Sequence, residues 1–335
     1  MPADRTRARQ PLTVLALGVA VIAAAVAAVA FGARDIAPAD AWAALLGHTG
    51  TVEQAAAHQR IPRTVLAMAV GASLAVAGTT LQAITRNPLA DPGIFGVLSG
   101  AALAVVVGLA FFGLSSRLST FLVAIAGAAA AAAFVYTVGS LGRSGATPLN
   151  LALAGAATAA AISSLISAIL LPRVEVMDSF RFWQIGDVGG ARLDHLALAA
   201  PFLLAGALLC GACATGLNAL ALGEDMATGL GKNVNAVRLV AYLGAVVLCG
   251  TATALAGPIA FVGLIVPHLC RLTVGTDHRW LLPVTALAGA VLLVAADTVG
   301  RVVARPEEVA VAVITPVLGA PLFIWIVRRQ KVREL

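Results

Sequence analysis

Long apolar runs occupy most of the sequence, and they constrain its fold more than any other feature. A run of about twenty apolar residues is long enough to cross a bilayer as a helix. Only 11% of the residues are charged and 60% are hydrophobic, whereas about a quarter of the residues in a soluble domain are charged. The sequence therefore predicts an all-α, polytopic membrane protein. Ten runs meet the criterion, at residues 12–32, 62–82, 94–113, 118–140, 150–171, 195–215, 236–256, 258–274, 281–302 and 310–327.

The number and flanks of these runs predict which side each end of the chain occupies. An even number of spans puts both ends on one side, and the basic residues Arg86, Lys232 and Arg271 fall on that side. Arginines on the opposite side mostly stand beside acids, as Arg34 does beside Asp35. Because loops rich in Lys and Arg stay in the cytoplasm, we expect both termini to be cytoplasmic.

The whole chain, residues 1–335, is predicted to form a single transmembrane domain. Its expected parts are two cytoplasmic tails, a helical bundle and a cytoplasmic loop, at 1–11, 328–335, 12–327 and 216–235. The first apolar run follows a basic start and so resembles a secretory signal, but it is longer than the apolar part of such signals. We interpret it as a retained first span, and its cleavage stays open as the alternative.

A polar turn interrupts the apolar sequence between Gln82 and Gly100. Pro88 and Pro92 each remove a backbone donor and disfavour helix in the residue before them. We therefore expect one helix to end near Gln82 and the next to begin near Gly93. The small residues from Gly93 to Gly100 predict a close approach of another helix, because small side chains let backbones pack closely in lipid.

The loop at 216–235 has the pattern of a short amphipathic helix. Its leucines and Met226 are interrupted by the acids Glu224 and Asp225, and glycines bound the segment. An apolar helical face outside the membrane needs a cover. That cover is the protein's own bundle, the lipid surface or a soluble partner, and the pattern alone leaves the three open. Two further short helices are expected on the opposite side, at 39–46 and 179–186.

Motifs for enzymatic chemistry are missing from the sequence. It contains no GxxxxGK[ST] phosphate loop, no HExxH and no GxSxG, and its five histidines are dispersed without metal-ligand spacing. The one acid deep in an apolar run is Asp297, four residues before Arg301. That spacing puts both side chains on one helical face, so we expect a structural ion pair there. The sequence predicts no enzyme activity, no metal site, no cofactor bound by this chain and no nucleic-acid partner.

The number, order and spacing of several motifs resemble one known family over about residues 55–330. The motifs are RIPRTVLAMAVGASLAVAGTTLQAITRNPLADPGIFGVLSGA, NLALAG, FWQIGDVGG, LNALALGEDMATGLG, GPIAFVGLIVPHLCRLTVGTDHRWLLP, AADTVGR and VITPVLGAPLFIW. They are similar to the FecCD family, the permease subunits of binding-protein-dependent ABC importers for ferric siderophores, haem and cobalamin. The resemblance implies ten transmembrane helices per subunit, in a bundle like that of the cobalamin-importer permease, in the bacterial cytoplasmic membrane.

The resemblance also implies the partners of the chain. Two permease subunits, identical or homologous, would pair around a central pathway in the lipid bilayer. Two ATP-binding subunits would bind beneath them and use the ATP and Mg, and an extracytoplasmic binding protein would deliver the substrate. A ferric siderophore is the expected substrate, with haem or cobalamin as alternatives. The rival class is an ion-coupled secondary carrier, which the scarcity of intramembrane acids disfavours.

Site residues follow from the resemblance position by position. Periplasmic arginines that would pair with glutamates of the binding protein are Arg60, Arg63 and Arg301. Residues matching the helix that docks on the ATPase are Leu217, Gly223, Glu224, Ala227, Leu230 and Gly231. Residues at the cytoplasmic gate are Asn87, Leu89, Thr147 and Pro148. Two features depart from the family pattern: Pro148 stands where a small polar residue is usual, and residues 308–312 read EVAVA in place of ELPxG.

Overall fold

A computed structural model describes residues 2–141 and 147–331 of the chain; for a few of these, including residues 2–9 and 325–331, it describes the backbone alone. Within this part the regular elements are all helices, which confirms the all-α prediction. Both predicted tails contribute to helices. The first helix begins at Pro2 and the last continues to Lys331, while residues 332–335 lie outside the described part.

A helix coincides with each of the ten predicted spans. In chain order these helices are α1 (Pro2–Ala30), α3 (Val52–Thr85), α4 (Val97–Phe112), α5 (Arg117–Ser140), α6 (Pro148–Leu170), α8 (Leu193–Ala212), α11 (Val234–Ala256), α12 (Val262–Val274), α13 (His278–Val303) and α14 (Val311–Lys331). Seven of the described helices are long and apolar enough to cross a membrane. The other three, α4, α12 and α14, contain shorter apolar segments.

Short helices occupy several of the connections. They are α2 (Pro38–Leu45), the 3-10 helix η1 (Pro92–Phe95), α7 (Val174–Gln184), α9 (Ala214–Ala221) and α10 (Glu224–Gly229). Helix α2 agrees with its predicted limits to within a residue. Helix α7 begins five residues before its predicted start; Glu175 in its first turn suits the positive end of a helix dipole.

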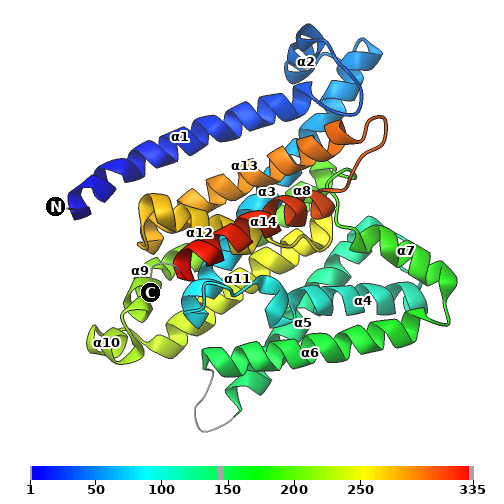
Figure 1. Cartoon of the computed structure of the whole chain (residues 1–335). Coiled ribbons are helices and arrows are strands. Elements are labelled where there is room, and N and C mark those ends of the chain that lie inside the picture. The colour runs from blue at the N-terminus through cyan, green and yellow to red at the C-terminus, as the bar shows by residue number, and fades with distance from the viewer. Residues whose placement is uncertain (1, 142–146, 332–335) are drawn as a thin grey trace.

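Helix α3 lies at the centre of the bundle. It packs against α13, α11 and α12, and α11 in turn packs against α8 and α5 (Figure 1). Glycine pairs bring these backbones together. A Cβ atom on Gly71 would collide with the backbone of Gly289 in α13, and a Cβ atom on Gly78 would collide with the backbone of Gly263 in α12. The core of the protein is therefore built on close helix crossings rather than on large side chains.

The start of α3 lies outside the predicted apolar run. The helix begins at Val52 instead of residue 62, because Oγ1 of Thr51 accepts a hydrogen bond from the backbone N–H of Gln54 and so caps its first turn. Pro62 is accommodated inside the helix. The first turns of α3 therefore extend the helix beyond its apolar part.

The polar turn after α3 differs slightly from its predicted limits. The helix continues three residues past Gln82 and ends at Thr85, and Arg86 then adopts the left-handed conformation with φ of 50°. Proline at position 88 restricts only the residue before it, so the chain can stay helical to Thr85. After η1, α4 begins at Val97. Its Gly100 packs against the backbone of Gly127 in α5, as the small residues predict.

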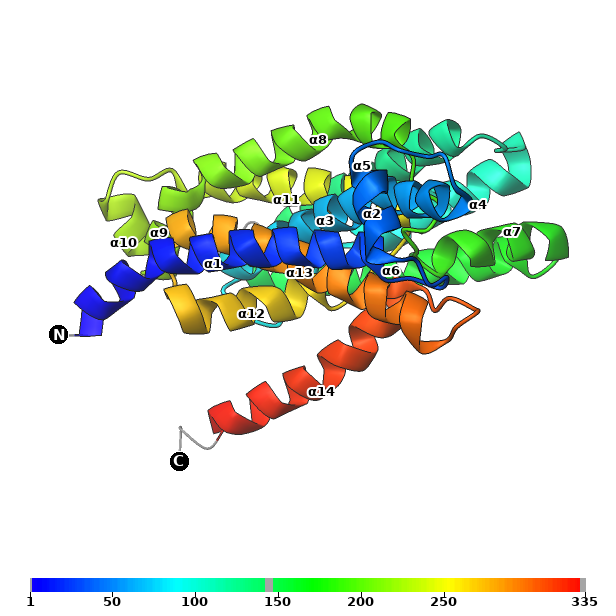
Figure 2. The same cartoon turned by 90° about the horizontal axis from the view of Figure 1, so that it is seen from above.

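The two ends of the bundle carry different short helices. Figures 1 and 2 both place the start of α1 and the end of α14 at the same end of the bundle as α9 and α10, and place α2 and α7 at the opposite end. We call these the α10 end and the α7 end. Figure 2 also shows α14 leaning away from the other helices. The chain thus begins and finishes at the same end of the bundle.

Candidate functional site

Two arginines and one aspartate form a buried ion-pair group near the α7 end. Arg63 of α3 donates from Nε and Nη2 to Oδ1 of Asp297 in α13, over 3.0 and 2.8 Å. Arg301, one turn further along α13, places its Nε 3.0 Å from Oδ2 of the same carboxylate, which confirms the ion pair expected from the spacing. Asp297 is 1% exposed and Arg301 is 2% exposed. Because an unpaired buried charge is costly, each of the three charges depends on the others.

Two further acids complete this group on its exposed side. Oε2 of Glu308 lies 2.6 Å from Nη1 of Arg63, and Oδ1 of Asp187 lies 3.7 Å from Nη2. The side chains of Glu308 and Asp187 are 39% and 40% exposed. We call Arg63, Asp187, Asp297, Arg301 and Glu308 the charge cluster. Sequence reasoning missed the pairing of Arg63 with these two loop acids, although the predicted topology places all three residues on one side.

Arg60 is held by backbone carbonyls instead of carboxylates. Its Nη1 donates to the carbonyl oxygens of Val29 and Ala30 at 2.9 and 3.0 Å, and its Nη2 donates to that of Arg34 at 2.7 Å. Arg60 therefore fastens the end of α1 to α3. The structure brings the three arginines of the predicted docking set to the α7 end, and all three have partners within the chain.

The predicted amphipathic helix in the 216–235 loop is two short helices instead of one. Gly223 separates α9 from α10 at a φ of 117°, a conformation that a residue with a Cβ adopts only under strain. Leu217 and Ala227 are fully buried against the bundle. Two of the six predicted docking residues are thus covered by the protein itself.

An apolar stripe remains exposed on and beside α10. Leu222, Met226 and Leu230 are 64%, 58% and 59% exposed. Met226 and Leu230 lie four residues apart along α10 and its C-cap, so they share one side of it, and Leu222 precedes the break at Gly223. We call these three residues the exposed stripe. Sequence reasoning included Leu230 in the docking set but not Leu222 or Met226; the four-residue spacing from Leu230 was the signal that could have added Met226.

Side-chain bonds fasten α9 and α10 to three helices of the bundle. Glu224 pairs with the buried Arg238 of α11, with Oε1 and Nη2 2.7 Å apart. Nε of Arg86, at the end of α3, donates to the carbonyl oxygen of Leu220 at 3.1 Å. The first bond joins α10 to α11, and the second joins α9 to α3.

The third bond runs from α9 to the start of α13. Nδ2 of Asn218 donates to Oδ1 of Asp277 at 2.6 Å, and Oδ1 of Asn218 accepts from the backbone N–H of His278 at 2.9 Å. Burial alone would raise the pKa of Asp277, but the hydrogen bonds from Asn218 and Arg279 outweigh it and hold the pKa below its ordinary value. Asp277 is therefore a charged anchor between α9 and α13.

The predicted gate residues lie in two capped turns. Oδ1 of Asn87 accepts a hydrogen bond from the backbone N–H of Leu89 at 2.9 Å, and both side chains are exposed. Thr147 caps α6 by accepting from the backbone N–H of Asn150 at 3.2 Å. Pro148 occupies the first turn of α6, where its missing N–H would have no helical partner anyway. This position explains how the chain accommodates proline in place of a small polar residue.

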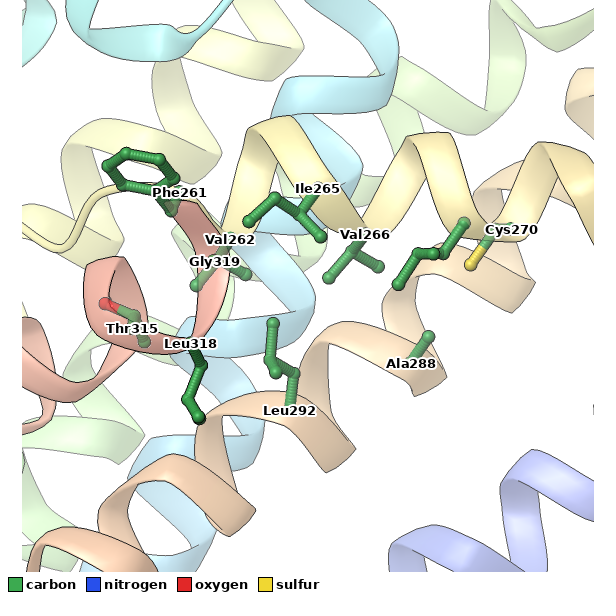
Figure 3. A pocket seen from close by; sticks show the side chains of 11 residues that line it. Phe261, Val262, Ile265, Val266, Cys270, Ala288, Leu292, Thr315, Leu318 and Gly319 are labelled. Carbon is green, nitrogen blue, oxygen red and sulfur yellow. The ribbon is translucent and has the colours of Figure 1, made fainter. Parts of the chain in front are cut away.

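Cavities open between the described helices, and two of them differ in size and lining. The smaller, of about 130 Å³, lies between α12, α13 and α14 and is almost wholly apolar (Figure 3). The larger, of about 510 Å³, lies at the α7 end and has mixed polar and apolar walls. Among residues 2–141 and 147–331, no group of three or more His, Cys, Asp or Glu side chains is placed to hold a metal ion.

Comparisons of the sequence with known proteins identify the family of this chain. The sequence model of the FecCD transport family matches residues 20–329. The chain belongs to the FecCD transport family. It is 46% identical over 272 residues to the ferric enterobactin transport system permease protein FepD of Escherichia coli (strain K12), with 81% of each protein covered. It is 39% identical over 277 residues to the hemin transport system permease protein HmuU of Yersinia pestis, with 81% of this chain and 82% of that protein covered.

A solved structure extends the likeness to the whole fold. An inward-facing conformation of a metal-chelate type ABC transporter aligns with a TM-score of 0.82 and 31% sequence identity, covering 95% of this chain and 99% of that chain. This FecCD family member is therefore a multi-pass membrane permease subunit of a bacterial ABC importer, and it is not itself an ATPase. The predicted class is confirmed. The roles assigned to single residues stay predictions.

Proposed function

We propose that this chain forms the membrane pathway of a binding-protein-dependent ABC importer for ferric siderophores. The observation that carries the proposal is the 46% identity to the ferric enterobactin permease protein across four fifths of both chains. Haem is the second candidate substrate, because the hemin permease protein is 39% identical over a similar length. Cobalamin stays the third, on the motif resemblance alone.

In the proposed assembly, two permease subunits, identical or homologous, enclose the pathway and two ATP-binding subunits bind at the α10 end. Ten helices cross the membrane, both termini are cytoplasmic, and the whole chain is one transmembrane domain. The helix at each predicted span and the shared position of the two chain ends support this topology. The chain needs no cofactor of its own, because ATP and Mg are used by the partner subunits.

The ATP-binding subunits dock on α10 and its flanks in this proposal. The exposed stripe offers the apolar contacts, and Glu224, Gly223 and Gly231 shape the segment that presents it. Leu217 and Ala227 act from below by anchoring this segment to the bundle. Movement of the ATP-binding subunits then reaches α3, α11 and α13 through the bonds described above, and the turns at Asn87–Leu89 and Thr147–Pro148 respond as the cytoplasmic gate.

The binding protein docks at the α7 end by exchanging ion pairs at Arg63. Glu308 and Asp187 are the exposed partners of Arg63, so a glutamate from the binding protein can replace either of them while Asp297 stays in place. Arg60 and Arg301 are the other two arginines predicted to dock. Both are bonded to backbone carbonyls, so in this proposal they hold the surrounding helix ends in position and Arg63 exchanges partners. An arginine suits this exchange because its planar guanidinium binds two carboxylates along different edges.

Uptake measurements in a strain lacking this gene test the proposed substrate. We expect loss of ⁵⁵Fe-siderophore uptake, restoration by the plasmid-borne gene, and unchanged uptake of haem and cobalamin. Loss of haem uptake alone would transfer the assignment to haem. Normal uptake of all three compounds in the deletion strain, with other importers for them removed, would overturn the proposal.

A further inference from the structure

The larger cavity at the α7 end has two chemically distinct zones. Its deep part is lined by buried apolar side chains, including Leu66, Val105 and Phe121, which are at most 5% exposed. Its mouth lies between the α4–α5 and α7–α8 connections and carries Arg117 and Arg192. The volume of about 510 Å³ exceeds what a few ordered waters would fill. A ligand that matches both zones must have a polar head and an apolar body.

The mouth of the cavity favours a negatively charged head. Arg117 has no carboxylate within ion-pair distance among the described residues, and its Nη1 donates to the carbonyl oxygen of Gly190 at 2.7 Å. That bond fixes the guanidinium and leaves most of its five N–H donors available. Arg192 is paired with Asp194 through Nε only. The one acid in the lining, Asp187, already faces Arg63 and accepts the N–H of Gly189. The mouth therefore offers guanidinium N–H groups in excess of free carboxylates, which is the pattern of a site for phosphate or carboxylate oxygens.

Helices α5 and α8 contribute to one side wall of the cavity, through Phe121 and Leu198 among others. Phe121 and Phe202 join the two helices through an edge contact with ring centroids 6.5 Å apart. The outward faces of both helices are apolar, with Leu122 of α5 and Leu204 of α8 48% and 63% exposed. The outer surface of this wall is therefore suited to contact with hydrocarbon chains.

We propose that this cavity binds an anionic phospholipid at the α7 end of the bundle, with its phosphate at Arg117 and Arg192. One acyl chain occupies the apolar depth of the cavity and the other lies against the apolar outer faces of α5 and α8. The bilayer itself supplies this ligand, and arginine guanidinium groups bind phosphate oxygens through charge-assisted hydrogen bonds. The bound lipid fills the space between α7 and α8 and so steadies the connection that carries Asp187 of the charge cluster.

Native mass spectrometry of the full-length chain, purified and delipidated in detergent, tests the proposal with palmitoyl-oleoyl phosphatidylglycerol as the probe. We expect one tightly retained phosphatidylglycerol and much weaker retention of phosphatidylcholine. Arg117→Ala together with Arg192→Ala should weaken phosphatidylglycerol binding at least about tenfold, the loss of charge-assisted hydrogen bonds to one phosphate. Arg34→Ala, which removes an exposed arginine from the same end of the bundle, should leave binding unchanged.

A second variant keeps the test independent of folding. Ser115 is exposed at the mouth, so Ser115→Glu adds a repelling charge without disturbing the core, and it should weaken phosphatidylglycerol binding while leaving the thermal midpoint in detergent unchanged. Glycerol 3-phosphate supplies the same head without the chains. If glycerol 3-phosphate binds as tightly as the lipid, the apolar zone contributes nothing to the affinity and the site binds a free anion. That result, or equal retention of phosphatidylglycerol by the wild type and both mouth variants, would overturn the proposal.

Discussion

The guanidinium of Arg63 holds one carboxylate oxygen of Asp297, 234 positions later in the chain, with two of its nitrogens at 3.0 and 2.8 Å. Arg301 engages the other oxygen of that carboxylate. One buried acid therefore pairs with two buried bases and fixes α3 against α13 at the α7 end, while Glu308 supplies a second negative charge to Arg63. Removing the carboxylate of Asp297 would leave the guanidinium groups of Arg63 and Arg301 buried without their shared counterion.

Asp297→Asn should destabilise the protein severely. The substitution preserves size and removes the charge, and breaking a buried ion pair by removing one partner costs about 3–5 kcal/mol. We expect a much lower thermal midpoint in detergent and little monodisperse protein on size-exclusion chromatography. The matched control is Asp178→Asn, whose pair with Arg181 is 61% and 63% exposed and should contribute about 1 kcal/mol or less. Similar midpoints for the two variants would contradict the role of Asp297.

A charge in the exposed stripe should separate the permease from its ATP-binding subunits. Burying a large apolar side chain contributes about 1.5–3 kcal/mol, so Met226→Asp should weaken association roughly tenfold or more. Co-purification and stimulated ATP hydrolysis measure the effect. Leu46→Asp is the control, because Leu46 is 63% exposed at the α7 end. Wild-type co-purification of Met226→Asp would remove the stripe from the docking surface.

A single methyl group should have opposite effects at two glycines. Gly78→Ala places a Cβ against the backbone of Gly263, whereas Gly18→Ala places one where no atom lies within 4 Å. Overpacking costs about 1–3 kcal/mol, while alanine in an open helical position stabilises by roughly 0.5–1 kcal/mol relative to glycine. Thermal midpoints should therefore fall for Gly78→Ala and hold or rise for Gly18→Ala. A midpoint for Gly78→Ala at or above the wild-type value would show that α3 and α12 can separate freely.

The stability contributed by Asp277 should depend on pH. Its pKa is lower in the folded protein than in an unfolded chain, so the charged form stabilises the fold. This contribution is complete above the unfolded pKa, about 3.9, and is lost as the pH falls through the lower folded pKa. We expect Asp277→Asn to be less stable than the wild type at pH 7, and the gap in thermal midpoint to shrink below about pH 4. A gap that is constant down to pH 3 would mean that the charge contributes nothing.

Hydropathy was enough to place the helices, because a bilayer demands long apolar segments with satisfied backbones. It failed at the start of α3, where residues 52–61 are polar enough to look like a loop. The hydrogen bond from Gln54 to Thr51 begins the helix there, and the acid Glu53 in its first turn was the available sequence signal. Local capping therefore set a boundary that hydropathy could not reveal.

The candidate site was only partly predictable for a different reason. The sequence shows that Leu217 and Leu222 are apolar, but only the packing of α9 on the bundle buries the first and leaves the second exposed. Likewise, the spacing of Asp297 and Arg301 follows from one helix, whereas the pairing of Arg63 with Glu308 depends on how distant helix ends meet. Periodicity fixes neighbours within a helix and cannot fix neighbours between helices.

The charge cluster also governs how the protein can be assembled as it is made. Arg63 leaves the ribosome 234 residues before the carboxylate that neutralises it, an interval of roughly 12–47 s at ordinary translation speeds. An arginine near the end of a span can reach the membrane surface before its partner exists, so α3 can enter the bilayer early with Arg63 unpaired. The buried contact between α3 and Asp297 forms only after α13 has been synthesised.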